Sequence, residues 1–197
     1  TFLPLVGAAL ILLFGGERLA RWIALATTLG TLAVSAPLYL HFDKASSTLQ
    51  FVESRDWIPS WNIAYGMGVD GISLPFIFLS SVLSILCIGA SWSAIQSRVR
   101  EFYAALLVAE TAMIGLFAAS NLFLFYIFWE MMLIPMYFLI GIWGYDRRVY
   151  AAIKFMLYTM AGSVLMLIAI LGLAYLHSAA TGSYTFDLLE LYSLDIA

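Results

Sequence analysis

The segment from Leu122 to Trp143 is apolar throughout, except for Glu130 near its centre. A helix needs about twenty consecutive apolar residues to cross the hydrocarbon core of a bilayer, and the core of a water-soluble protein does not require such a run. The segment is therefore predicted to span a membrane. An ionisable side chain at that depth is costly and usually lines a proton or ion path, so Glu130 is the leading candidate for function.

The rest of the chain follows the same pattern, because 63% of it is hydrophobic and only 11% is charged. This composition predicts an all-α, polytopic transmembrane bundle. Residues 1–101 are expected to hold three helices with a loop at about 41–69, and residues 102–177 three more. The polar stretch 178–197 has no finishing element, so we expect a longer protein. The six predicted spans are Phe2–Phe14 (which looks clipped), Trp22–Leu40, Gly71–Trp92, Phe102–Ala119, Leu122–Trp143 and Val149–His177.

Basic residues sort the connections between these spans into two sides. Only Lys44 and Arg55 occur on one side, in the loop at 41–69, where aromatic residues favour an anchor at the membrane interface over a partner-docking loop. The positive-inside rule places the richer side in the cytoplasm, and hence both visible ends outside. The residues of that richer side are Arg18, Arg21, Arg98, Arg100, Arg147 and Arg148.

Glu110 is a second carboxyl within the predicted bundle, on the helix that precedes Glu130. At about 1.5 Å of rise per residue, Glu130 lies about 13 Å and Glu110 about 15 Å from the turn at Ser120 and Asn121. Two groups at one depth can share a proton or hold one in turn. A carboxyl that alternates between a buried position, which raises its pKa, and a position beside a cation, which lowers it, would take up and release protons. The alternative is that both glutamates are hydrogen-bonded packing residues.

Tyr126 and Tyr137 fall near the same helical face as Glu130, where their phenols can hydrogen-bond a carboxyl or hold a water. Pro135 cannot donate to the carbonyl of Met131, so that carbonyl is free to bind water or a side chain. Proline is also common in membrane helices without such a role. This face therefore has two interpretations, a hydrated path beside Glu130 or a helix surface in which the proline has no functional role.

Lys154 and His177 are further candidates on the sixth predicted span. Lys154 is about 9 Å from the arginine-rich end of its helix, so its stem can reach the interface, and an anchoring role competes with a relay role. His177 is expected to be an exposed interfacial histidine. The sequence has no nucleotide, flavin, haem or metal motif, and Cys87 is its single cysteine, so no cofactor is expected. The net charge of −3 indicates no nucleic-acid partner.

The runs Phe125–Gly144, Gly68–Leu74 and Tyr150–Ser163 resemble the antiporter-like membrane subunit M of bacterial NADH:quinone oxidoreductase and mitochondrial subunit 4. The resemblance implies a multi-pass protein of the bacterial inner membrane, with about fourteen helices that include two inverted repeats. It implies no redox centre. Glu130 matches the glutamate of the family's fifth helix, whose partner is a lysine on the seventh, and Glu110 looks like an acidic residue of the fourth.

The leading hypothesis is therefore a non-redox subunit of that enzyme, which moves protons through buried Glu and Lys relays while quinone reduction occurs elsewhere. Its expected partners are other membrane-arm subunits, the lipid bilayer, and protons and water as relay species. A multisubunit cation/proton antiporter or a membrane-bound hydrogenase is a close alternative. A structural membrane scaffold, in which the glutamates only hold helices together, is an alternative of another class.

Overall fold

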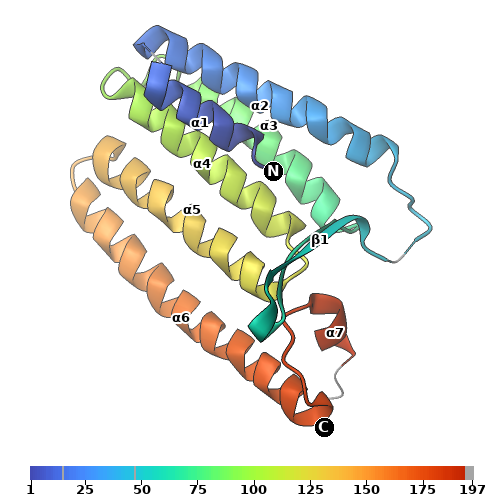
Figure 1. Ribbon diagram of the computed structural model, residues 1–197. Coiled ribbons are helices and arrows are strands. Elements are labelled where there is room, and N and C mark those ends of the chain that lie inside the picture. Colours follow the sequence, from blue (N-terminus) through green and yellow to red (C-terminus); the bar gives the residue numbers. More distant parts are fainter. Residues whose placement is uncertain (15, 47, 194–197) are drawn as a thin grey trace.

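Six helices run side by side in alternating directions, and a β-hairpin and a short seventh helix lie at one end of them (Figure 1). The computed structural model describes residues 1–14, 16–46 and 48–193. The helices are α1 (Leu3–Phe14), α2 (Glu17–Leu40), α3 (Ser73–Ser91), α4 (Val99–Ala118), α5 (Leu122–Trp143), α6 (Arg148–Thr181) and the short α7 (Leu188–Tyr192). The hairpin consists of β1 (Gln50–Ile58), the 3-10 helix η1 (Pro59–Trp61) and β2 (Ile63–Val69).

Five helices, α2 to α6, are long and apolar enough to cross a membrane. They correspond to five of the six predicted spans, and the mainly helical membrane fold is confirmed. The first predicted span is α1, an apolar helix of only 12 residues. At 34 residues, α6 is longer than the about twenty residues that the hydrocarbon core requires.

The helix α4 occupies the centre of the bundle and packs against α1, α2, α3 and α5. Toward its beginning, Tyr103 and Leu107 are fully buried against apolar residues of α1 and α2. Toward its end, Ile114 packs with Leu124 and Phe128 of α5. Because α4 is the most buried of the five spans, a buried polar side chain in its middle must find its partners within the protein.

The loop at 41–69 folds into an antiparallel hairpin, which the sequence did not predict. The hairpin is held by the turn between α4 and α5, where the Ser120 amide donates to the Gly66 carbonyl at 3.0 Å. The same turn receives the segment before α7, since the Leu122 amide donates to the Phe186 carbonyl at 2.8 Å. A β-carbon on Gly66 would lie 2.7 Å from the Ser120 hydroxyl, so a larger residue here would have to displace that hydroxyl.

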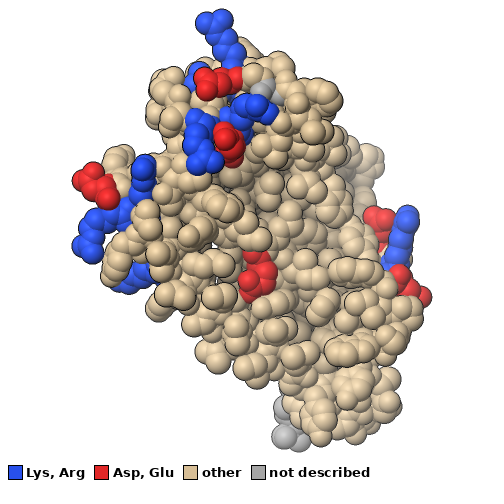
Figure 2. All heavy atoms as spheres, turned by 60° about the vertical axis from the view of Figure 1, so that its left-hand side comes forward, with Lys and Arg blue, Asp and Glu red and all other residues tan. Residues whose placement is uncertain are grey.

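The two ends of the bundle differ in chemistry. We call the end that holds β1 and β2 the hairpin end, and the end that holds the six arginines named above the arginine end. At the arginine end, Arg21 donates to the Ile95 carbonyl and Arg148 to the Ile142 carbonyl, both at 2.8 Å. Charged side chains gather at the ends, and the surface between them is uncharged in this view except for one acidic group (Figure 2). This distribution suits a bilayer between the two ends.

Candidate functional site

Glu130 lies in the middle of α5 on the side that faces α6. It is half-buried, and its Oε1 atom is buried without a hydrogen-bond partner among the described residues. One helical turn earlier, the Tyr126 hydroxyl lies close to both the Glu130 carboxyl and the Ser163 hydroxyl of α6. A carboxyl, a phenol and an alcohol therefore meet between two membrane-spanning helices.

Glu110 lies in the middle of α4 and is fully buried. Its Oε2 atom accepts a hydrogen bond of 3.1 Å from the Thr28 hydroxyl of α2, and its Oε1 atom has no partner among the described residues. Thr28 also lies 3.0 Å from the Ala24 carbonyl, so its single proton is shared between two acceptors. The carboxyl is thus only partly satisfied, which is uncommon for a buried group.

The two carboxyl groups lie at similar heights but have different neighbours. Gly115 of α4 is in close contact with Phe128 of α5, and this antiparallel register places Glu110 less than one helical turn from Glu130 along the bundle axis. Glu110 is bonded to α2, whereas Glu130 lies beside α6. No hydrogen bond joins the two carboxyls in the part of the chain that the structure describes, so proton sharing between them stays a prediction.

The other predicted site residues are less closely associated with Glu130. Tyr137 is half-buried, and its ring packs against Phe138 at a centroid distance of 5.6 Å. Lys154 is exposed on α6, with its ammonium 5.9 Å from the centre of the Tyr150 ring. Among the described residues, neither Tyr137 nor Lys154 has a hydrogen bond or ion pair with Glu130, so their relay roles stay predictions.

The expectation of an exposed His177 was wrong. Its ring is 7% exposed, with Nδ1 2.9 Å from the Ser183 carbonyl and 3.1 Å from the Thr181 hydroxyl. The chain turns back after α6 at Gly182, whose φ of 85° is in the left-handed region. This turn covers the histidine, and sequence periodicity alone does not reveal such a return.

Thr28 and Ser163 are the partners that the sequence did not single out. Both are hydroxyl residues within apolar helices, where such residues usually bond to their own helix. The signal for Thr28 was its spacing with Thr31 and Ser35, which places three hydroxyls on one face of α2.

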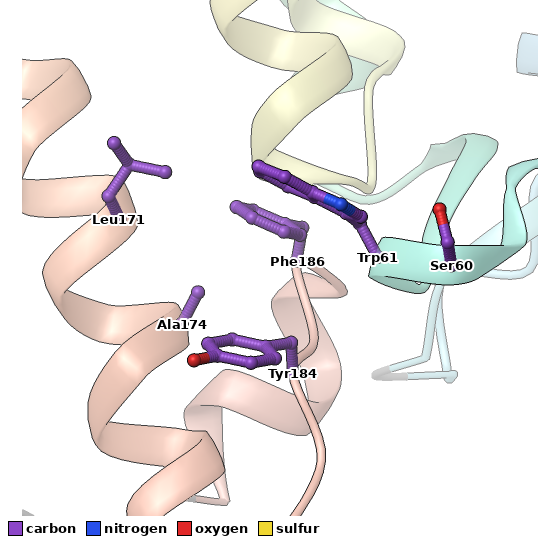
Figure 3. A pocket seen from close by; sticks show the side chains of 6 residues that line it. All are labelled: Ser60, Trp61, Leu171, Ala174, Tyr184 and Phe186. Carbon is purple, nitrogen blue, oxygen red and sulfur yellow. The ribbon is translucent and has the colours of Figure 1, made fainter.

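A cavity of about 280 Å³ lies at the hairpin end, away from any carboxyl group of the site. Figure 3 shows Trp61 of the hairpin and Phe186 facing Leu171 and Ala174 of α6, with Tyr184 below them. These side chains provide apolar contact and no acid or base in the neutral range. Among the described residues, no three potential metal ligands cluster together. Glu110 and Glu130, with their hydroxyl neighbours, are thus the carboxyl groups in the middle of the described membrane-spanning helices.

Two family models match consecutive parts of the chain. "NADH-ubiquinone oxidoreductase chain 4, amino terminus" matches residues 18–118, and "NADH:quinone oxidoreductase/Mrp antiporter, TM" matches residues 119–195. The chain is 44% identical to NADH-quinone oxidoreductase subunit M of Rhodobacter capsulatus, with 99% of this chain and 38% of that protein aligned. It is 36% identical to F(420)H(2) dehydrogenase subunit M of Methanosarcina mazei, over 95% of this chain and 38% of that protein.

Solved structures share the fold of this chain. A chain of respiratory complex I from Thermus thermophilus with bound NADH superposes on all of this chain and 38% of that one, with a TM-score of 0.82 and 29% identity. A chain of the Mrp complex from Dietzia shares the fold, with a TM-score of 0.67 and 19% identity over 93% of this chain and 19% of that one. The present chain therefore spans a little over a third of the length of the curated relatives described above.

Proposed function

Because the chain belongs to the family of NADH:quinone oxidoreductase subunit M and chain 4, we propose that Glu130 is the central proton-carrying group of a proton-translocating membrane-arm subunit. The observation that supports this role is the Oε1 atom of Glu130, which is buried in a membrane-spanning helix, close to the Tyr126 hydroxyl, and has no hydrogen-bond partner among the described residues. A carboxyl kept in such a place is costly, and proton transfer is the usual reason to retain it.

The chemistry of the proposed site follows from its neighbours. A protonated Glu130 is neutral and can remain in the apolar layer, whereas an ionised Glu130 needs a donor or a cation close by. The Tyr126 phenol can donate to the carboxylate, and Ser163 can hold the phenol or a water in line. Tyr137 and Glu110 are proposed as secondary members of the relay. Arrival and departure of a compensating cation would then drive the release and uptake of the proton.

The wider assignment is part of the same proposal. The chain would act as a non-redox part of an enzyme complex, without a cofactor of its own, and other membrane-arm subunits and lipid would surround it. It would lie in the bacterial inner membrane, with the arginine end in the cytoplasm and the hairpin end outside. Lys154, near the arginine end, would lie at the cytoplasmic interface, where its stem can reach the headgroups.

Replacement of Glu130 tests the proposal in the full-length subunit within its assembled complex. Glu130→Gln keeps the shape of the side chain but removes its titration, so proton translocation per quinone reduced should fall well below that of the parent. The ratio can be measured in sealed vesicles with a pH-sensitive dye. Glu101→Gln is a matched control, because Glu101 is an exposed acidic residue at the start of α4, 3.5 Å from Arg98. An unchanged ratio in Glu130→Gln would exclude the relay role.

A cation/proton antiporter is the second candidate, since the matched family model and the Dietzia structure both carry the Mrp name. Sodium-dependent proton movement without electron flow from NADH would favour it. A scaffold role makes the opposite prediction for two variants. Glu130→Leu would then disturb assembly by removing a hydrogen-bonding group, whereas Glu130→Gln would be almost silent.

A further inference from the structure

A second set of polar side chains lies between α2, α3 and α4, apart from Glu130. Six hydroxyl residues of α2 and α3 are each at most 7% exposed, although both helices are apolar enough to cross a membrane. Their spacing along each helix follows the three- and four-residue steps of a single face. We call this set the hydroxyl seam; it comprises Thr28, Thr31 and Ser35 of α2 and Ser80, Ser81 and Ser84 of α3.

Contacts between α3 and α4 place Glu110 at this seam. Ser91 donates to the Tyr103 hydroxyl at 3.2 Å, and Phe76 stacks on Phe117 at a centroid distance of 5.0 Å. The antiparallel register fixed by these two contacts brings Ser84 to the height of Glu110. The buried carboxyl, already bonded to Thr28 of α2, therefore has the Ser84 hydroxyl of α3 at its own level.

Contacts between α2 and α3 align the two halves of the seam. Tyr39 packs against Phe78, and Trp22 packs against Trp92, with centroid distances of 5.9 and 5.2 Å. This register places Thr31 at the height of Ser84, and it places Ser35 one turn further at the height of Ser80 and Ser81. From Thr28 to Ser35 the seam rises about 10 Å toward the hairpin end.

Two buried atoms at the seam have no partner among the described residues. These are Oε1 of Glu110 and Oγ of Ser81, and both side chains are fully buried. Thr31 and Ser35 donate to carbonyls of their own helix at 2.9 and 2.8 Å, so their oxygens keep acceptor sites for other donors. Buried polar atoms of this kind are commonly satisfied by internal water. Water can both donate to and accept from atoms of this kind.

One end of the seam, at Ser35, borders a cavity of about 310 Å³ at the hairpin end. Ser35 lines this cavity, and so does Ile114, which lies one turn beyond Glu110. Tyr65 and Glu53 line it on the hairpin side. Burial and the Glu53 carboxylate raise the pKa of the Tyr65 phenol, and Arg55 partly offsets this rise. The phenol therefore stays protonated near neutral pH and can donate to water in the cavity.

In the part of the chain that the structure describes, the helices packed around Glu110 place no cation beside it to compensate its ionised form. The sequences of α1, α3 and α5 contain no lysine or arginine. The basic residues of α2 and α4 are Arg18, Arg21 and Arg100, and all three lie at the arginine end. The other ionisable groups on these packed elements are Glu17, Glu101, Glu130, Cys87 and the tyrosines, none of which is a cation. An uncompensated buried carboxylate is unfavourable, so the proton itself is the counter-charge of Glu110.

We propose that Glu110 exchanges its proton with the hairpin side of the membrane through water held in the hydroxyl seam. In this step the carboxyl O–H bond breaks, the proton passes to a seam water and then along water to the cavity, and the Thr28 hydroxyl donates to the carboxylate that remains. The reverse transfer restores the acid. This inference rests on the proposed proton-translocating role, and it adds a route through α2 and α3 that does not pass Glu130.

Hydrogen–deuterium exchange of the Glu110 carboxyl tests the route in the full-length subunit within its assembled complex. The infrared band of this carboxyl is assigned by its absence in Glu110→Gln, and its shift is followed after dilution into deuterated buffer. The double variant Thr31→Val, Ser84→Ala removes two seam hydroxyls near the height of the carboxyl and should slow the exchange about tenfold, because hydrogen-bonded steps of the path are lost.

Thr159→Val is the control for this measurement. The Thr159 hydroxyl is on α6, outside the seam, and donates to the Phe155 carbonyl of its own helix at 2.7 Å. The control therefore removes the same kind of hydroxyl from a membrane-spanning helix and should leave the exchange of the Glu110 carboxyl unchanged. Equal rates in the double variant and the parent would refute the route.

Cysteine labelling is the second measurement, and it identifies the side to which the seam opens. In a Cys87→Ala background, a small membrane-impermeant thiol reagent is added from the hairpin side. Ser35→Cys and Thr31→Cys should react, whereas Ala24→Cys, buried on the same face of α2 toward the arginine end, should not. An inert Thr31→Cys beside a reactive Ser35→Cys would show that the seam is dry and would overturn the proposal. Both measurements should be unchanged in Glu130→Gln, so this test and that of the proposed function fail separately.

Discussion

At Gly115, the backbone of α4 lies directly against the Phe128 ring of α5, which leaves no room for a side chain at position 115. A β-carbon on this glycine would overlap the ring of Phe128, which is 3% exposed. Gly115→Ala should therefore destabilise the protein by about 1–3 kcal/mol, the usual cost of overpacking a filled core. The thermal unfolding temperature of the purified subunit or complex measures this effect.

Gly89→Ala is the matched control, since the β-carbon there meets no atom of the described chain within 4 Å on the exposed side of α3. This change should be neutral or slightly stabilising, because alanine favours the helix over glycine. Phe128→Leu should partly rescue Gly115→Ala by making room for the methyl group. If Gly115→Ala is as stable as Gly89→Ala, α4 and α5 do not touch at this point.

The sequence identified the two glutamates of the candidate site but not the residues that surround them. Glu130 and Glu110 were identified from the sequence, because a charge in an apolar run is costly wherever the run is placed. Their separate neighbours were not, since Thr28 and Ser163 become significant only when the helix register brings them to a carboxyl. The burial of His177 was missed for the same reason, because it depends on a chain reversal beyond the end of α6.

At the scale of elements, the turn between α4 and α5 depends on Asn121. Its side-chain oxygen accepts from the amides of Phe123 and Leu124 at 3.0 and 3.3 Å, which caps the first turn of α5. Asn121→Ala should cost about 1 kcal/mol, the typical loss of a helix N-cap. Asn121→Asp keeps the acceptor and should retain most of the stability in a thermal unfolding measurement. Equal losses in the two variants would show that the cap has no role.

The spans themselves were predictable and the hairpin was not. Apolar runs of sufficient length determine helices in a bilayer, because the backbone must satisfy its own hydrogen bonds there, so α2 to α6 lie where the sequence placed them. The strands β1 and β2 lie outside that constraint. They depend on contacts with the turn between α4 and α5, such as the close approach of Gly66 to Ser120, which no local pattern reveals.

At the scale of the whole molecule, the two chemically different ends determine the orientation in the membrane. The excess of arginine at one end predicts that this end is cytoplasmic and that the hairpin end is outside. Thr48→Cys, exposed at the hairpin end, should react with an impermeant thiol reagent added to intact cells in the Cys87→Ala background. Tyr145→Cys, at a position 95% exposed at the arginine end, should react only after the cells are opened. The reverse pattern would invert the proposed topology, and the hydroxyl seam would then lead from Glu110 to the cytoplasm.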